Sequence, residues 1–386
     1  MRTATLGVVL CLSVVLRGAG EPQAPAPALT TAIDQLVSFD FPTRVNAART
    51  IRRLPAADTV PVLARAAREH KDGYVRYKAL VLLAGYGDVS AASTMRALLE
   101  DRNDRVRAVT YGWFEQHPDP ALVTALVAAA ERETSEFVRP ALMRALAAIH
   151  AQPAARDALQ PLIFRGEDYF RGAVIEALGD YRAEWAVKDI AAVAQLEGPL
   201  QDDAITALGK IGARSALPVL AELQKSSARH VQPSVSAATC LITQECTAHE
   251  DYLQKALAYG AATPDQQELL RGSAFSLAVL AARGRTTACA GLLKVAEPST
   301  EPVRTTLGLA VGTMAMKNPM VVLESLENRP GDLKPALEVL RDGFDMLNED
   351  LAEERFFVEV RKAFWAAPEG SRRRAVAQAL IDFLEF

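Results

Sequence analysis

Aromatic residues are scarce in this sequence, because phenylalanine, tryptophan and tyrosine together account for 6% of its 386 residues. No stretch alternates apolar and polar residues over a length that would indicate a β-strand. Alanine-rich segments with apolar residues at helical spacing occupy most of the chain instead, and alanine is the residue that most favours a helix. We therefore expect an all-α protein.

An excess of basic residues is also missing, because the formal net charge is −4. Proteins that bind nucleic acid through its phosphates usually carry a basic surface, so we expect no nucleic-acid partner. The five histidines are scattered and match none of the short motifs of zinc or redox sites. A nucleophile elbow and a phosphate-binding loop are absent as well. The sequence therefore predicts no catalytic residue, no cofactor and no metal, and hence a protein that is not an enzyme.

Long apolar runs are confined to the N-terminus. Residues 1–20 have the layout of a secretory signal peptide, with an apolar run from Leu6 to Leu16 and small residues before a cleavage site after Gly20. We expect export to the periplasm or to the extracellular space. Cys11 lies within the apolar run, which leaves a lipid anchor as an alternative to free export.

The chain after the signal peptide lacks any stretch of the roughly 18 apolar residues that a membrane-spanning helix needs. We expect no transmembrane segment in the mature protein. Residues 21–30 are rich in proline and are predicted to form a disordered spacer. Residues 31–386 are predicted to form one folded unit, because an internal repeat runs through them.

The repeat is clearest from Leu200 to Leu223, which reads as a helix, a turn and a second helix. Gly209 and Gly212 are expected to end the first helix, because glycine adopts the left-handed conformation of a helix C-terminal cap. Apolar residues line one face of each helix, at the spacing of a helical stripe. They are Ala204, Ala207, Leu208 and Ile211 in the first helix and Leu217, Leu220 and Leu223 in the second.

Similar units start at regular intervals along the chain. Many begin with an apolar residue followed by arginine, with small or apolar residues three and seven positions on, as at Val106-Arg107. The first seven starts lie 30 to 32 residues apart, at Arg44, Arg76, Arg107, Arg139, Arg171, Gln201 and Gln232, and later units start near Arg271, Arg304, Lys334 and Arg373. The interval from Gln232 to Arg271 is 39 residues, and its polar insert at 261–267 is a candidate hinge.

Two runs, DRNDRVRAVTYGWF and LQDDAITALGKIGARSALPVLAEL, resemble HEAT repeats, in particular the short HEAT-like repeats of the phycobilisome-lyase type. The resemblance implies a right-handed α-solenoid of about eleven helical hairpins, less regular after residue 316. It also implies that the helices with the valine-arginine pairs line the concave side. A single hairpin cannot bury all its apolar surface, so we expect the hairpins to stack into a curved rod.

The HEAT resemblance favours a scaffold that binds a protein or peptide partner on its concave face through many weak contacts. Aromatic and arginine side chains are common at such surfaces. The candidate binding residues are Tyr74, Arg76, Tyr77, Arg107, Tyr111, Trp113, Arg139 and Tyr169. We expect Tyr74, Tyr77 and Tyr111 to be the most exposed of these. The alternatives are an accessory or chaperone-like subunit for an enzyme or chromophore-lyase system, and a structural spacer.

The charged residues of the repeats also have structural interpretations. Each repeated arginine would pair with an acid of its own or an adjacent repeat and donate to loop carbonyls. The acidic run from Asp342 to Glu354 would be a solvated helix face rather than a docking site for a basic partner. The di-iron deoxyhypusine hydroxylases, which share HEAT-like repeats, use four His-Glu pairs, whereas this chain has the single pair His249-Glu250. The resemblance therefore adds no metal site.

Three cysteines follow the signal peptide, and export would place them in an oxidising compartment where disulfides form. Cys246 and Cys289 both follow inter-helix turns of neighbouring repeats, so the predicted disulfide joins these two. A local bond between Cys240 and Cys246 and three free thiols are the alternatives.

Overall fold

The computed structural model describes residues 27–87 and 90–385. Within them lie 22 α-helices, four short 3-10 helices and no β-strand, so the all-α prediction is confirmed. The predicted signal peptide and most of the predicted spacer, residues 1–26, lie outside the described residues. Residues 27–30, which we placed in the spacer, instead begin helix α1, and Leu29 is 1% exposed.

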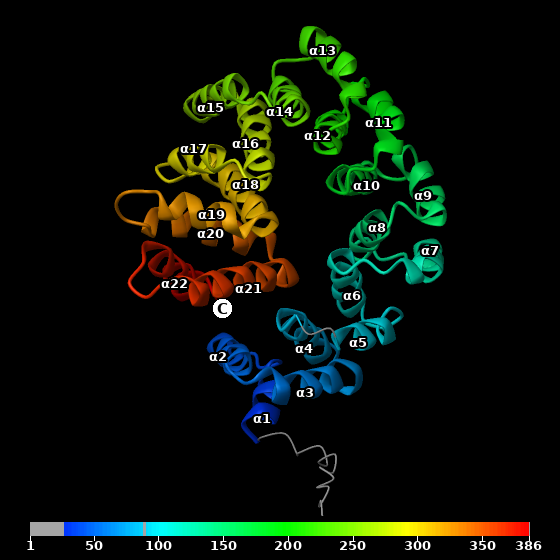
Figure 1. The fold of residues 1–386 in the computed structure, drawn as a ribbon, viewed down its shortest axis with the longest axis vertical. Coiled ribbons are helices and arrows are strands. Elements are labelled where there is room, and N and C mark those ends of the chain that lie inside the picture. The colour runs from blue at the N-terminus through cyan, green and yellow to red at the C-terminus, as the bar shows by residue number, and fades with distance from the viewer. Residues whose placement is uncertain (1–26, 88–89, 386) are drawn as a thin grey trace, which may run out of the picture.

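The helices alternate between two rows, with even-numbered helices in an inner row and odd-numbered helices in an outer row (Figure 1). The inner helices are α2 (Phe41–Arg52), α4 (Gly73–Gly85), α6 (Asp104–Gln116), α8 (Arg139–Ala148), α10 (Asp168–Asp180), α12 (Gln201–Ile211), α14 (Gln232–Thr243), α16 (Gln267–Ala282), α18 (Val303–Lys317) and α20 (Lys334–Leu347). The outer helices are α1 (Pro27–Gln35), α3 (Ala56–Glu69), α5 (Ala91–Ala97), α7 (Val123–Arg132), α9 (Pro153–Leu159), α11 (Val187–Ala194), α13 (Leu217–Ser226), α15 (Thr247–Ala262), α17 (Thr286–Ala296) and α19 (Pro319–Glu327). Helices α21 (Asp350–Ala366) and α22 (Arg372–Leu384) complete the chain.

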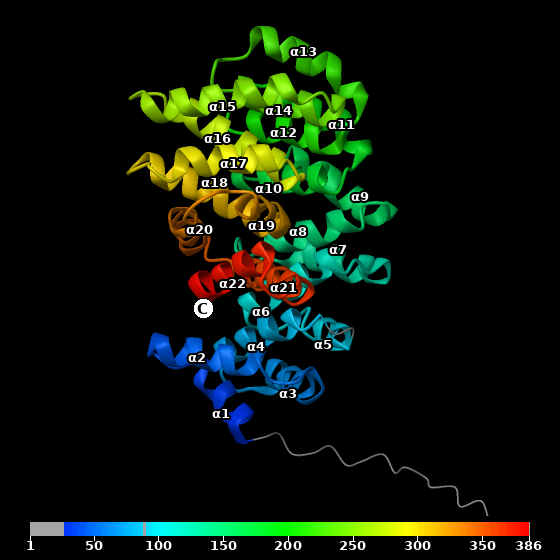
Figure 2. The ribbon, with the colours of Figure 1, turned by 60° about the vertical axis from the view of Figure 1, so that its left-hand side comes forward.

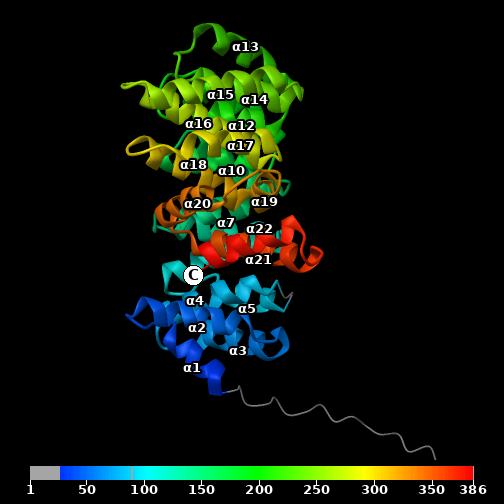
Figure 3. The same ribbon diagram turned by 90° about the vertical axis from the view of Figure 1, so that its left-hand side faces the viewer.

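Each inner helix from α2 to α18 packs on the next inner helix, and the buried apolar residues between the rows form two clusters, one from Leu29 to Ile242 and the other from Ala237 to Leu384. The side view shows the hairpins stacked along the long axis of the molecule (Figure 3). This arrangement is the α-solenoid that the repeat predicted, because each hairpin covers the apolar faces of its neighbours.

Two glycines of the unit from Leu200 to Leu223 have different roles. Gly212 follows α12 with φ +81°, so it is the left-handed cap that we predicted. Gly209, however, lies inside α12, and the prediction that it ends the helix is wrong. A Cβ added at Gly209 would lie 2.5 Å from the Cα of Ala238 in α14. Glycine is therefore needed at this position for the close approach of two inner helices.

The additional residues in the long interval between Gln232 and Arg271 lie in longer helices rather than in a longer loop. Helices α15 and α16 are 16 residues each, and only residues 263–266 separate them. In the described part of the chain, no single helix has the length and apolar character of a membrane span, although α18 and α19, which are bent by 109°, meet that criterion when taken together.

The two arms of the solenoid meet. The chain runs from α1 to α13 along one side, turns at α13 and α14, and returns along the other side to α21 and α22 (Figures 1 and 2). Helix α21 packs against α4, and the side chains of Leu351 and Arg355 reach Gly112 in α6. We call this contact of α21 with α4 and α6 the closing contact. The predicted curved rod therefore closes on itself as a loop.

Candidate functional site

The repeated arginines hold neighbouring loops together. Arg76 is 4% exposed and donates to the carbonyl oxygen of His70 at 3.2 Å and to Oδ1 of Asp101 at 2.9 Å. Arg107 donates to the carbonyl oxygen of Asp101 at 2.8 Å and to both carboxylate oxygens of Glu133 at 2.7 and 2.9 Å. The structural interpretation holds for Arg76 and Arg107, because each of these two joins its own loop to an acid of the next repeat.

Three of the aromatic candidates are buried. The exposed fractions of Tyr77, Tyr111 and Trp113 are 7%, 2% and 6%. Tyr77 donates its hydroxyl to Asp350, and Tyr111 donates to the carbonyl oxygen of Leu99 at 2.9 Å. Burial raises the pKa of Tyr111 to about 12. The expectation that Tyr77 and Tyr111 are exposed is wrong, since low aromatic content leaves these large side chains to fill space between alanine-rich helices.

The remaining binding candidates, Tyr74, Arg139 and Tyr169, differ in their exposure and contacts. Tyr74 is partly buried, with its ring 5.9 Å from that of Tyr77. Arg139 lies over the ring of Phe170 at 3.7 Å, which is a cation–π contact. Asp101 and Glu133 are the acids that pair with Arg76 and Arg107. At the equivalent position of the next repeat stands Arg165, so Arg139 has no acid there to pair with. Tyr169, at 49% exposure, is the candidate that presents a large aromatic surface to solvent.

Tyr169 belongs to a surface that we did not predict. Phe137, Phe164 and Leu196 are 54%, 50% and 62% exposed, on the loops that precede α8, α10 and α12. These three inner helices pack side by side, so the loops at their N-terminal ends lie along one edge of the solenoid. We call Phe137, Phe164, Tyr169 and Leu196 the loop-edge patch. The sequence contains a pattern that could have indicated this surface. Phe137 and Tyr169 both stand two residues before the repeated arginine, as Tyr74 does.

The closing contact covers the concave side of the N-terminal repeats. Glu354 of α21 is 3% exposed and forms ion pairs with Arg52 at 2.6 Å and with Arg361 at 2.8 Å. Asp350 forms an ion pair with Lys78 at 2.5 Å and accepts from Tyr77. The interpretation of the run from Asp342 to Glu354 as a solvated face is therefore wrong for these two acids. Their basic partner is the chain's own N-terminal arm.

A second set of charges joins the arms further along. Lys317 of α18 contacts Glu176 of α10 and lies 3.2 Å from Asp180, which also pairs with Lys210 at 2.8 Å and with Arg144 at 3.1 Å. The positive charge of Lys317 lowers the pKa of Glu176 to about 2. Burial alone would raise the pKa of Asp180, but Lys317, Lys210 and Arg144 together lower it. Both carboxylates are therefore ionised at neutral pH and hold the arms together.

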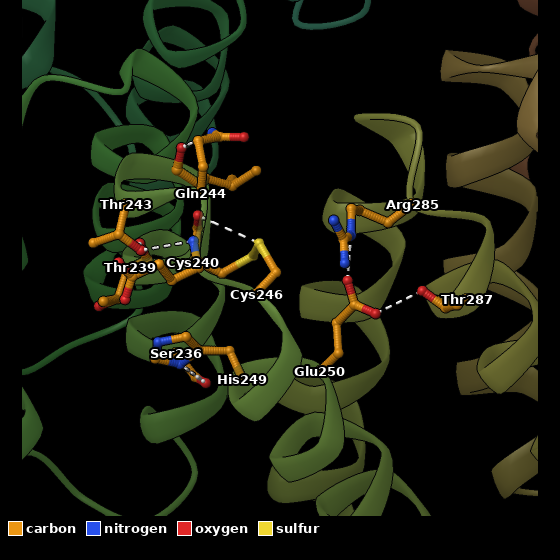
Figure 4. Close-up of a disulfide and its surroundings, with 12 residues drawn as sticks. Ser236, Thr239, Cys240, Thr243, Gln244, Cys246, His249, Glu250, Arg285 and Thr287 are labelled. Carbon is orange, nitrogen blue, oxygen red and sulfur yellow. Dashed lines mark hydrogen bonds and ion pairs between the residues drawn. A yellow bond between two sulfur atoms is a disulfide. The ribbon is translucent and has the colours of Figure 1, made fainter.

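The disulfide joins Cys240 to Cys246, and the predicted bond between Cys246 and Cys289 is wrong (Figure 4). Cys240 lies in the last turn of the inner helix α14 and Cys246 directly precedes α15, so the turn between the two helices brings their Cα atoms to 4.6 Å. Cys289 is a buried free thiol in α17, and burial raises its pKa to about 11.

No group of three or more histidine, cysteine, aspartate or glutamate side chains that could hold a metal occurs among the described residues. The His249-Glu250 pair is divided between separate contacts. His249 faces the hydroxyl of Ser236 at 2.8 Å, whereas Glu250 accepts from Arg285 and from Thr287 (Figure 4).

The fold and these contacts define a class of protein, an α-solenoid of stacked helical hairpins whose arginines tie successive loops. Residues 27–112 match the family model of HEAT repeats, so this part of the chain consists of HEAT repeats. The resemblance that the sequence indicated is confirmed. No curated protein sequence matches the chain.

Solved structures with a similar arrangement include the YibA protein of Escherichia coli, with 16% identity over 56% of this chain and 82% of that one and a TM-score of 0.42. The complex of CpcE and CpcF of phycocyanin lyase from Nostoc has 19% identity over 87% of this chain and 100% of that one, with a TM-score of 0.27. Kap121p bound to Nup53p has 11% identity over 92% of this chain and 49% of that one, with a TM-score of 0.43.

Proposed function

We propose that this protein is an exported, non-enzymatic HEAT-repeat scaffold that binds a protein or peptide partner through the loop-edge patch. The observation that carries the proposal is the exposure of four large side chains, those of Phe137, Phe164 and Leu196 on three successive loops and that of Tyr169 in the first turn of α10. Rigid aromatic side chains bury much area at little cost in entropy when a partner covers them.

The loop-edge patch replaces the concave face as the proposed binding surface. Tyr77 of α4 contacts Asp350 of α21 in the closing contact, and Tyr111 of α6 is buried beside Leu99, so neither side chain is open to a partner. The loop-edge patch lies outside the closing contact, at the ends of α8, α10 and α12.

Export has two independent supports. Residues 1–20 have the layout of a signal peptide, and the Cys240–Cys246 disulfide is of a kind that persists in oxidising compartments. Fractionation of the native host should place the protein outside the cytoplasm, shortened by about twenty residues as expected of signal cleavage. A full-length cytosolic protein would contradict the export part of the proposal.

Partner binding can be tested with a photo-crosslinking amino acid in place of Phe164 in the native host. We expect a crosslinked product of higher mass, which mass spectrometry would identify. The matched control is the same amino acid at Tyr252, an aromatic residue that is 38% exposed on the outer helix α15. Equal crosslinking at both positions, or none at Phe164, would overturn binding through the loop-edge patch.

A further inference from the structure

A cavity lies between the units that begin at Gln201 and Gln232. It has a volume of about 450 Å³ and lies between the loops that precede α12 and α14, next to the start of α16. Gln201, Asp202 and Ser227 line it, together with Glu268 and Arg271. This volume lies within the roughly 300 to 1,000 Å³ of typical ligand pockets.

The unit of Arg107 explains why space is left at this position. Its guanidinium donates to the carbonyl oxygen of the preceding loop and pairs with Glu133, which stands 26 residues later. In the later unit glutamine replaces the arginine, and Ser227, again 26 residues later, replaces the acid. Gln201 still donates to the preceding loop, at the carbonyl oxygen of Ala194 at 3.1 Å. Both members of the ion pair are therefore replaced by smaller neutral side chains.

Two polar atoms at the cavity lack partners. Oδ1 of Asp202 and Oγ of Ser227 are buried and have no hydrogen-bond partner among the described residues. A buried polar atom without a partner is costly, at roughly 1 to 3 kcal/mol, so this pair is a feature that a bound group would relieve. Burial raises the pKa of Asp202, although Ser234, His230 and Arg271 favour its ionised form.

The charge around the cavity favours a cation. Among the described residues that line it are three carboxylates, those of Glu197, Asp202 and Glu268, and one guanidinium, that of Arg271. His230 lines it as well, with its Nδ1 3.4 Å from Glu268. The loop-edge patch adjoins this cavity in the chain, because Leu196 directly precedes Glu197. A peptide that covers the loop-edge patch could thus extend one side chain into the cavity.

We propose that this cavity binds the guanidinium group of an arginine side chain supplied by a partner peptide. The proposal rests on the proposed function and names the chemistry of that partner. The incoming guanidinium takes the place of the repeat's missing arginine, and it donates to Oδ1 of Asp202 and Oγ of Ser227. Its planar set of donors can serve several acceptors at once, which the point charge of a lysine cannot do as well.

Titration of the mature protein with N-acetyl-arginine methylamide, followed by ligand-observed NMR, tests the proposal. We expect saturable binding with a dissociation constant on the order of 1 mM. The citrulline analogue, which keeps the shape without the charge, should bind about tenfold more weakly or not at all. Equal binding of both compounds would overturn the proposal.

Two variants locate the binding. Gln201→Arg restores the arginine of the other repeats, and its guanidinium should occupy the cavity and abolish binding of the probe while the melting temperature stays equal or rises. Asp202→Asn should weaken the probe about tenfold. Asp157→Asn, an exposed acid on the outer helix α9, is the matched control and should bind like the wild type.

The outcomes separate this inference from the proposed function. Unchanged binding in Gln201→Arg and Asp202→Asn would place the probe elsewhere and overturn the cavity proposal. Crosslinking at Phe164 that persists beside such a result would leave the loop-edge patch intact as a binding surface. Loss of the probe in both variants without any crosslink at Phe164 would support the cavity and overturn the loop-edge patch.

Discussion

Burial separates the aromatic residues of this chain into two groups. Tyr111 and Phe114 are 2% exposed and belong to the core, whereas Phe137 and Tyr169 are about half exposed. Sequence position alone did not distinguish them, because all four lie at or near inner helices. The difference arises from the position of each residue along its helix. Tyr111 and Phe114 lie within α6, while Phe137 and Tyr169 stand at the helix N-terminal ends, where the edge of the solenoid is open.

Replacement of a buried tyrosine should therefore lower the stability of the fold far more than replacement of an exposed one. Tyr111→Ala removes a packed ring and the hydrogen bond to Leu99, and should lower the free energy of unfolding by about 3 to 5 kcal/mol. Tyr169→Ala should change it by no more than about 0.5 kcal/mol. Thermal and urea denaturation followed by circular dichroism would measure both. Similar losses in the two variants would contradict the assignment of Tyr169 to an exposed surface.

The pairing of the cysteines differs from the one that their positions in the repeats predicted. A bond between Cys246 and Cys289 was inferred from equivalent positions after turns in neighbouring repeats. The structure joins Cys240 and Cys246 instead, because the α14–α15 turn brings these two together within one hairpin. Which sulfur atoms meet depends on the rotation of each helix about its axis, and helical periodicity does not define that rotation to within a disulfide bond.

At the level of helices, the sequence predicted the fold well because the signal is local and repeated. Apolar stripes at a spacing of 30 to 32 residues placed the inner helices, and Arg76 and Arg107 form the loop and acid contacts of the structural interpretation. The role of Gly209 was missed, because a glycine that permits close packing and a glycine that ends a helix look alike in a sequence. Only the position of Ala238 in α14 tells them apart.

The close packing of α12 on α14 leads to a prediction. Gly209→Ala places a Cβ 2.5 Å from the Cα of Ala238, so the helices must separate, and we expect a loss of about 1 to 3 kcal/mol in the free energy of unfolding. Gly291→Ala in α17 is the matched control. Its Cβ would meet only the flexible side chain of Gln254, at 3.2 Å, and the better helix propensity of alanine should stabilise the protein by up to about 1 kcal/mol.

Denaturant unfolding of the two glycine variants gives the signs directly. A stable Gly209→Ala protein would mean that α12 and α14 can move apart without cost. The close approach would then not be the reason for glycine at this position.

At the level of the whole molecule, the repeat pattern in the sequence could not predict the closing contact. Arg52 and Glu354 are 302 positions apart, and Tyr77 and Asp350 are 273 positions apart. Small rotations between successive hairpins add up along a solenoid, so whether its ends meet depends on every repeat between them. The acidic run of α21 was visible in the sequence, but its partners were not.

Closure should depend on pH. Glu176 has a pKa lowered to about 2, from 4.5, by Lys317, and the pKa of Glu354 is also lowered, because Arg52 and Arg361 outweigh its burial. A carboxylate with a lowered folded-state pKa stabilises the fold above its unfolded pKa, and that contribution is lost as the pH falls. We therefore expect the arms to separate between pH 4.5 and about 2, with a rise in the radius of gyration by small-angle X-ray scattering.

Glu354→Gln tests the same contact at neutral pH. The substitution leaves Arg52 and Arg361 without their buried acid and should cost about 3 to 5 kcal/mol. We expect a larger radius of gyration at pH 7 than in the control Glu369→Gln, an exposed acid in the loop before α22. A variant as compact as the control, with helix content unchanged in both, would show that closure does not depend on this ion pair.

The closing contact also limits how this repeat array can evolve. An open solenoid can gain or lose a hairpin by duplication or deletion, because each unit touches only its neighbours. In this chain, one hairpin more or less would shift α21 away from α4 and leave Glu354 and Asp350 opposite the wrong residues. The number of repeats is thus a property that selection acts on, and relatives with the same closed architecture are expected to vary in loop length rather than in repeat count.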